Sequence, residues 1–182
     1  TWMVPTRKNG LVGKVQVRLA AMAVISGSVW LWSAVMEFVL SYADISGQEP
    51  QQATIEQLRF FATEIAQGSY LGWNILLAGI ATFIALAART VTGLGVAAVL
   101  ALAALWAIAL TGHAATDGNH DLAVNLQFLH LVGIALWIGC LVGVLWVHRH
   151  PDTDLPVLVS RYSRLAGWCF AAVAISGVGA AL

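Results

Sequence analysis

Apolar residues run through this chain in long blocks that are separated by shorter polar segments. About 20 helical residues cross the roughly 30 Å of hydrocarbon in a bilayer, so a block near that length predicts a membrane-spanning helix. The pattern therefore predicts an all-α fold, a polytopic transmembrane bundle of about five helices in a single domain. The five blocks cover residues 15–43, 70–88, 92–115, 124–148 and 165–182. The last block has no polar flank, which predicts that the sequence is part of a longer polypeptide.

The polar segment at residues 51–67 has a different pattern. It follows Pro50, and Thr54 with Gln57 three residues later is typical of a capping box at a helix start. Apolar residues then fall on one helical face, so we expect a short amphipathic helix lying on the membrane surface. This face comprises Ile55, Leu58, Phe61, Ala62 and Ile65.

Composition and charge give the class and the orientation. Of the 182 residues 59% are hydrophobic and 10% are charged, which excludes an ordinary soluble domain and gives no sign of a nucleic-acid partner. Eight of the nine Lys and Arg residues lie in the N-terminal segment, at Arg89 or after residue 148, whereas the other side carries only Arg59. By the positive-inside rule the N-terminus is cytoplasmic, and segment 51–67 lies outside.

Three histidines are expected at the outer end of one helical hairpin. His113 closes the third block, His130 lies within the fourth, and His120 lies in the loop between them. A polar group at membrane depth is costly unless it finds a partner, and imidazole is a good copper ligand. The sequence therefore predicts an outer copper site of His113 and His130, helped by His120 or by Glu37 in the first block. The alternatives are a hydrogen bond to a neighbouring helix for His130 and a solvated side chain for His120.

A second group lies toward the inner side. Cys140 and Cys169 fall within the fourth and fifth blocks, and His148 and His150 follow the fourth. Thiolate favours Cu(I), so these residues predict an inner copper station if the two helices touch. The alternatives are cysteines that pack as small apolar residues and histidines that face the lipid headgroups. Cysteines inside apolar runs also argue against a disulfide framework.

From about residue 69 to 177 the chain resembles the bacterial copper-resistance D (CopD) membrane proteins. The matching pieces are TGHAA at 111–115, LHLVGIALWIG at 129–139 and RYSRLAG at 161–167, followed by Ser176 and Gly177. The resemblance implies a multi-pass protein of the bacterial cytoplasmic membrane that is tied to copper uptake and often works with a periplasmic copper-binding protein. It carries over His113 and His130 as copper-contacting positions. In some bacteria a similar domain is fused to one that resembles a cytochrome oxidase copper-assembly factor.

We therefore expect copper transfer across the membrane, for homeostasis or for supply to a copper enzyme, rather than catalysis. One alternative is a haem-b cytochrome, because two histidines on facing helices are also the arrangement of bis-imidazole haem ligation. His113 and His130 would then bind the iron, and Trp106 and Trp137 would line the porphyrin. The other is an assembly subunit of a respiratory oxidase complex that binds no metal.

Overall fold

The computed structural model describes residues 14–111, 120–148 and 154–179, with side chains described from residue 17 and, after the first gap, from residue 121. This part of the chain is all helical and contains no strand, which confirms the predicted all-α class. The elements are α1 Lys14–Ser46, the 3-10 turn η1 Pro50–Gln52, α2 Ile55–Glu64, α3 Ala66–Ala87, α4 Val91–Ala109, α5 His120–Val147 and α6 Leu155–Gly179.

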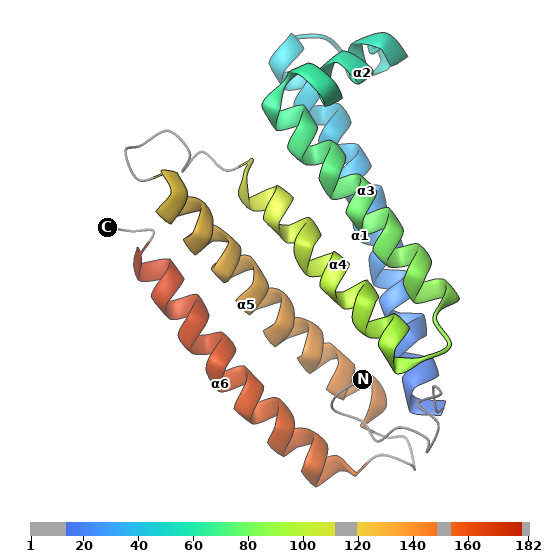
Figure 1. Cartoon of the computed structure of the whole chain (residues 1–182), viewed down its shortest axis with the longest axis vertical. Coiled ribbons are helices and arrows are strands. Elements are labelled where there is room, and N and C mark those ends of the chain that lie inside the picture. The colour runs from blue at the N-terminus through green and yellow to red at the C-terminus, as the bar shows by residue number, and fades with distance from the viewer. Residues whose placement is uncertain (1–13, 112–119, 149–153, 180–182) are drawn as a thin grey trace.

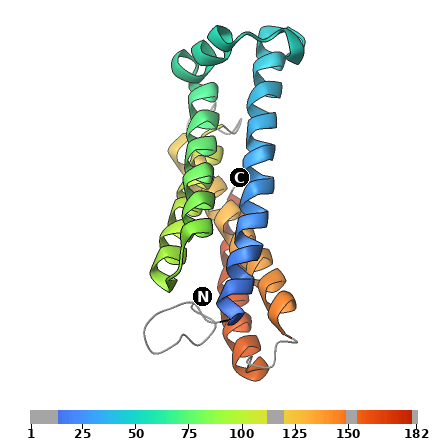
Figure 2. The same cartoon turned by 90° about the vertical axis from the view of Figure 1, so that its right-hand side faces the viewer.

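The long helices pack mainly against their neighbours in sequence. Figure 1 shows α4, α5 and α6 side by side, with α3 packed on the other side of α4. The first helix, α1, lies along α3 and also reaches α5. In Figure 2, α2 lies across one end of the bundle and joins the ends of α1 and α3. The ends where α4 stops and α5 begins therefore lie in the half of the bundle that α2 caps.

Small residues fill the interior, and large apolar side chains point outward. The buried positions include many alanines, of which Ala104 is fully buried and Ala78 is 1% exposed. By contrast, Trp32 is 69% exposed and Phe83 is 70% exposed. Helices in lipid approach each other closely through small residues and leave their large apolar residues to the lipid tails. The chain is therefore a multi-pass membrane protein, and the bilayer covers its outer surface.

By length and composition, four helices of the described part could cross a membrane, namely Val17–Ser46, Ala66–Ala87, Val91–Ala109 and Asp121–Val147. Over its described residues α6 is not among them. It begins at Leu155, ten residues before the expected fifth block, and carries Arg161 and Arg164 in its first half. The early start has a local cause, because the Asp154 carboxylate accepts a hydrogen bond from the Val157 N–H at 3.2 Å and so caps the helix.

The short helix α2 begins as the sequence predicts. The Thr54 side chain accepts a hydrogen bond from the Gln57 N–H, and the Gln57 side chain accepts one from the Thr54 N–H, which completes the capping box. Phe61 is buried on the inner face of α2, whereas Ile55 is 86% exposed and does not join that face. The Phe61 ring lies 5.2 Å from that of Phe38 and holds α2 against α1.

Candidate metal site

His130 lies on α5 and is partly buried where α5 meets α6. Its Nδ1 lies 3.0 Å from the Oγ of Ser176 on α6. The Ser176 hydroxyl also donates a hydrogen bond to the Val173 carbonyl oxygen, at 3.0 Å, and Ser176 is 1% exposed. The imidazole is therefore held by a buried polar group on the neighbouring helix, which confirms the hydrogen bond that the sequence offered as the alternative for His130. One ring nitrogen has a partner, and no described hydrogen bond involves the other.

Two glycines set the distance between α5 and α6 around this contact. A Cβ on Gly133 would lie 2.8 Å from Val173 Cγ2 and 3.4 Å from the Cys169 carbonyl oxygen. Near the other end of the contact, a Cβ on Gly179 would lie 2.8 Å from Leu126 Cδ1. Because glycine has no side chain at these two positions, the two backbones approach closely enough for His130 to reach Ser176.

An aromatic pair fixes α4 against α5 on the opposite side of α5. The rings of Trp106 and Phe128 lie 4.9 Å apart, nearly edge to face, two residues before His130. The last turn of α4 is closed by the Thr111 N–H, which donates to the Ile108 carbonyl oxygen at 3.0 Å. The C-terminal end of α4 thus lies beside the part of α5 that carries His130.

Of the other outer residues, His113 lies outside the described residues. His120 is the first residue of α5 rather than part of a loop, and its side chain is also outside the described set. Ten residues of helix, about 15 Å, separate the backbones of His120 and His130. The structure therefore describes one imidazole of the predicted trio.

Glu37 is exposed on α1. Contact between α1 and α5 is found toward the other end of the bundle, where a Cβ on Gly143 would lie 3.6 Å from Leu19 and 3.9 Å from Met22. Gly143 is thirteen residues from His130, a turn of about 220° around the helix axis, so the imidazole faces away from α1.

The described part of the chain contains three of the four residues of the predicted inner station, Cys140, Cys169 and His148. Both cysteines are free thiols, with Cys169 buried and Cys140 partly buried. The Nδ1–H of His148 donates to the Leu145 carbonyl oxygen of its own helix at 2.7 Å, and His150 lies outside the described residues. Within the described ranges, no group of three or more His, Cys, Asp or Glu side chains could hold a metal ion.

The two tryptophans named for the haem alternative lie on different sides of α5. Trp106 contacts Phe128 between α4 and α5, whereas Trp137 packs 6.0 Å from Phe170 of α6. They therefore do not flank one space, and the Trp106–Phe128 pair occupies the α4–α5 contact on the side of α5 opposite to the His130–Ser176 contact. These residues do not fit a porphyrin held between the two helices.

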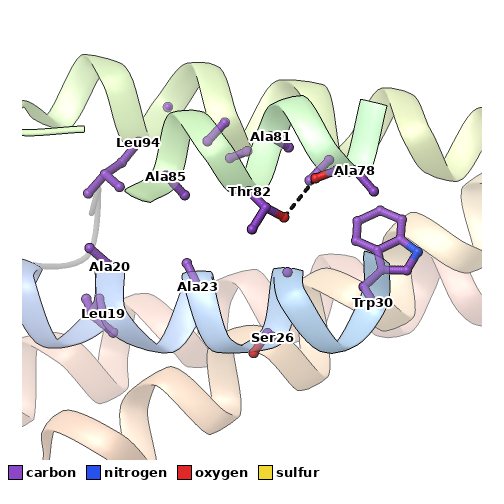
Figure 3. A pocket seen from close by; sticks show the side chains of 15 residues that line it. Leu19, Ala20, Ala23, Ser26, Trp30, Ala78, Ala81, Thr82, Ala85 and Leu94 are labelled. Carbon is purple, nitrogen blue, oxygen red and sulfur yellow. Dashed lines mark hydrogen bonds between the residues drawn. The ribbon is translucent and has the colours of Figure 1, made fainter. Parts of the chain in front are cut away.

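A cavity of about 370 Å³ lies elsewhere, between α1, α3 and α4 (Figure 3). Alanines and glycines form most of its wall, and the Thr82 hydroxyl donates to the Ala78 carbonyl oxygen at 2.7 Å instead of facing a ligand. No histidine or cysteine lines it, so the cavity offers no soft or imidazole donor for copper.

Sequence reasoning missed two buried polar side chains. Ser176 entered only as part of a motif, and Asn74 on α3 was not singled out. The Asn74 Nδ2 donates to the Ala104 carbonyl oxygen of α4 at 2.9 Å, and its Oδ1 has no hydrogen-bond partner among the described residues. Each is a polar residue inside an apolar run, which is the signal that could have identified both.

Comparison with known proteins gives the family. Residues 1–122 match the family described as copper resistance protein D-like, N-terminal domain, which is about two thirds of the chain. The chain belongs to this copper-resistance family. No curated protein and no solved structure matches the chain. The family match includes Glu37, His113 and His120, whereas His130 and Ser176 lie beyond it.

Proposed function

We propose that this protein binds copper in the outer half of the bundle, at His130 and His113, and moves or delivers it across the bacterial cytoplasmic membrane. Membership of the copper-resistance family supports copper as the cargo. The observation that carries the proposal is the imidazole of His130, partly buried within an apolar helix and held by Ser176. An ionisable side chain at membrane depth marks a functional site by default, since its burial is costly.

The donor set suits copper. Imidazole nitrogen binds both Cu(I) and Cu(II). His113 follows the outer end of α4 in sequence, and α4 packs against α5 beside His130. His120, at the start of α5, would assist capture at the surface. Glu37, exposed on α1, would assist as a carboxylate donor. An inner station of Cys140, Cys169, His148 and His150 would receive the ion after transfer.

Transfer, rather than catalysis, is the proposed activity. Copper would arrive from a periplasmic copper-binding protein and would leave toward the cytoplasm or toward a respiratory oxidase under assembly. The positive charges near the N-terminus and after α5 support a cytoplasmic position for those ends, and the His130 half of the bundle would then face the supply.

The experiment is copper stoichiometry, by metal analysis, on the purified wild type and on the double variant His113→Ala, His130→Ala. We expect the double variant to lose the bound copper. The control is Ser33→Ala, at an exposed position on α1, which should retain the copper. Full copper binding by the double variant would overturn the proposal, and loss of oxidase assembly without loss of copper would favour the assembly role. A strong Soret band in the same samples would restore the haem alternative.

A further inference from the structure

The polar contact between α5 and α6 is a chain of two hydrogen bonds, and one placement of protons makes both. The Ser176 hydroxyl has a single proton and lies 3.0 Å from the Val173 carbonyl oxygen and 3.0 Å from His130 Nδ1. A carbonyl oxygen only accepts, so the bond to Val173 uses the hydroxyl proton. The bond to His130 then requires a proton on Nδ1, and the imidazole is the donor.

We infer that Ser176 is a positioning residue that holds His130 in the Nδ1–H tautomer and leaves Nε2 as the copper-binding atom. The inference rests on the proposed function for the identity of the metal. A neutral imidazole binds metal through its unprotonated nitrogen, and the bond made by the other nitrogen decides which one that is. The two ring nitrogens point in divergent directions, so Nε2 points away from Ser176.

Burial strengthens this choice of tautomer. In the opposite tautomer the Ser176 hydroxyl would have to give up its bond to Val173 in order to donate to Nδ1. Ser176 is 1% exposed, so water does not replace the lost bond. One hydrogen bond of typical net strength corresponds to a preference of roughly fivefold. The disfavoured tautomer also carries its proton on Nε2, where it would block a metal ion.

This inference makes α6 part of the site. Ser176 reaches His130 only because Gly133 and Gly179 let the two helices approach closely. The family match ends at residue 122, so the positioning group comes from a part of the chain beyond it. Copper capture then depends on how α6 packs against α5 as well as on the histidines.

The test reads the tautomer directly in the metal-free protein. The full chain is labelled with 15N-histidine and reconstituted in lipid bilayers at alkaline pH, where histidine is neutral, and its 15N NMR spectrum is recorded. The protein has five histidines, and the signals that are lost in the His130→Gln variant are assigned to His130. We expect Nδ1 of His130 to carry the proton and Nε2 to be unprotonated. Predominant protonation of Nε2 in the wild type overturns the inference without any variant.

Variants then separate positioning from packing. Ser176→Ala should shift His130 toward the Nε2–H tautomer and weaken Cu(I) binding on the order of tenfold, and Ser176→Thr should restore both. The matched control is Ser33→Ala, because Ser33 also donates to a carbonyl of its own helix, Val29 at 2.9 Å, but lies exposed on α1. Weaker copper binding in Ser176→Ala with an unchanged tautomer would overturn the inference.

The two proposals fail in different measurements. If the variant lacking His113 and His130 still binds copper fully, the proposed function is wrong while the tautomer of His130 remains as measured. If the wild-type tautomer is the opposite one, the role of Ser176 is wrong while copper binding at His130 can persist through Nδ1.

Discussion

The α1–α3–α4 unit and the α5–α6 pair both bury a polar side chain between helices, but with different consequences. In the first unit, Asn74 donates to the Ala104 backbone carbonyl, and both residues are at most 1% exposed. In the pair, buried Ser176 meets partly buried His130, and no hydrogen bond of the described residues involves the second ring nitrogen of His130. A buried polar group that ends on the backbone fixes packing, whereas one that ends on a titratable ring with an open nitrogen can bind a ligand.

The two parts of the bundle also differ in how tightly their helices pack. The α1–α3–α4 unit contains the cavity of about 370 Å³, and its wall is built from small apolar residues. The α5–α6 pair is more tightly packed, because Gly133 and Gly179 each lie against a side chain of the other helix. This cavity and the proposed copper-binding imidazole therefore lie in different parts of the bundle.

The largest expected effect comes from separating α5 and α6. Gly133→Leu places a side chain where a Cβ already lies 2.8 Å from Val173 Cγ2, so the helices must move apart and His130 loses Ser176. We expect copper affinity to fall about 100-fold, with about 1–3 kcal/mol of overpacking cost. Copper titration measures the affinity, and unfolding in detergent measures the loss of stability. Gly139→Leu is the control, since nothing lies within 4 Å of its Cβ position, and equal effects of the two changes would contradict the assignment.

The second prediction concerns the cap over α1 and α3. Phe61→Ala removes a ring that is 2% exposed and contacts Phe38 and Tyr42, so it should cost about 3 kcal/mol of stability. Thermal unfolding in detergent provides the measurement, and copper stoichiometry should not change. Phe60→Ala, at a position 59% exposed, should cost much less. Loss of copper in Phe61→Ala would show that the two units are coupled.

The third prediction compares two alanines of α4. Ala104 is fully buried, whereas Ala101 lines the cavity, so Ala104→Leu should cost about 1–3 kcal/mol and Ala101→Leu should be tolerated. Thermal unfolding in detergent compares the stabilities of the two variants. If Ala101→Leu is as destabilising as Ala104→Leu, lipid or another helix fills that space in the membrane.

The smallest effect is expected for Asn74→Ala. It removes one interhelical hydrogen bond, and such bonds average below about 1 kcal/mol in membrane proteins. Stability should fall slightly while copper affinity stays at the wild-type value. A copper defect as large as that of Ser176→Ala would erase the distinction drawn between the two buried polar contacts.

Local features of the fold could be predicted from the sequence. The apolar blocks predicted the all-α membrane fold, and the Thr54–Gln57 spacing predicted the capping box that starts α2. Both depend on residues at most a few turns apart. The start of α6 was not predicted, because its first ten residues mix apolar and basic side chains, and the hydrogen bond between Asp154 and Val157 decides the boundary.

The sequence by itself determined that the chain is a multi-pass helical protein with histidine and cysteine side chains at membrane depth, since length and hydropathy are properties of single segments. Only the tertiary structure decided that His130 meets Ser176, 46 residues away. Such pairings depend on the rotation and register of one helix against another. Those are fixed by the glycine contacts along α5 and α6, and no pattern within one helix encodes them.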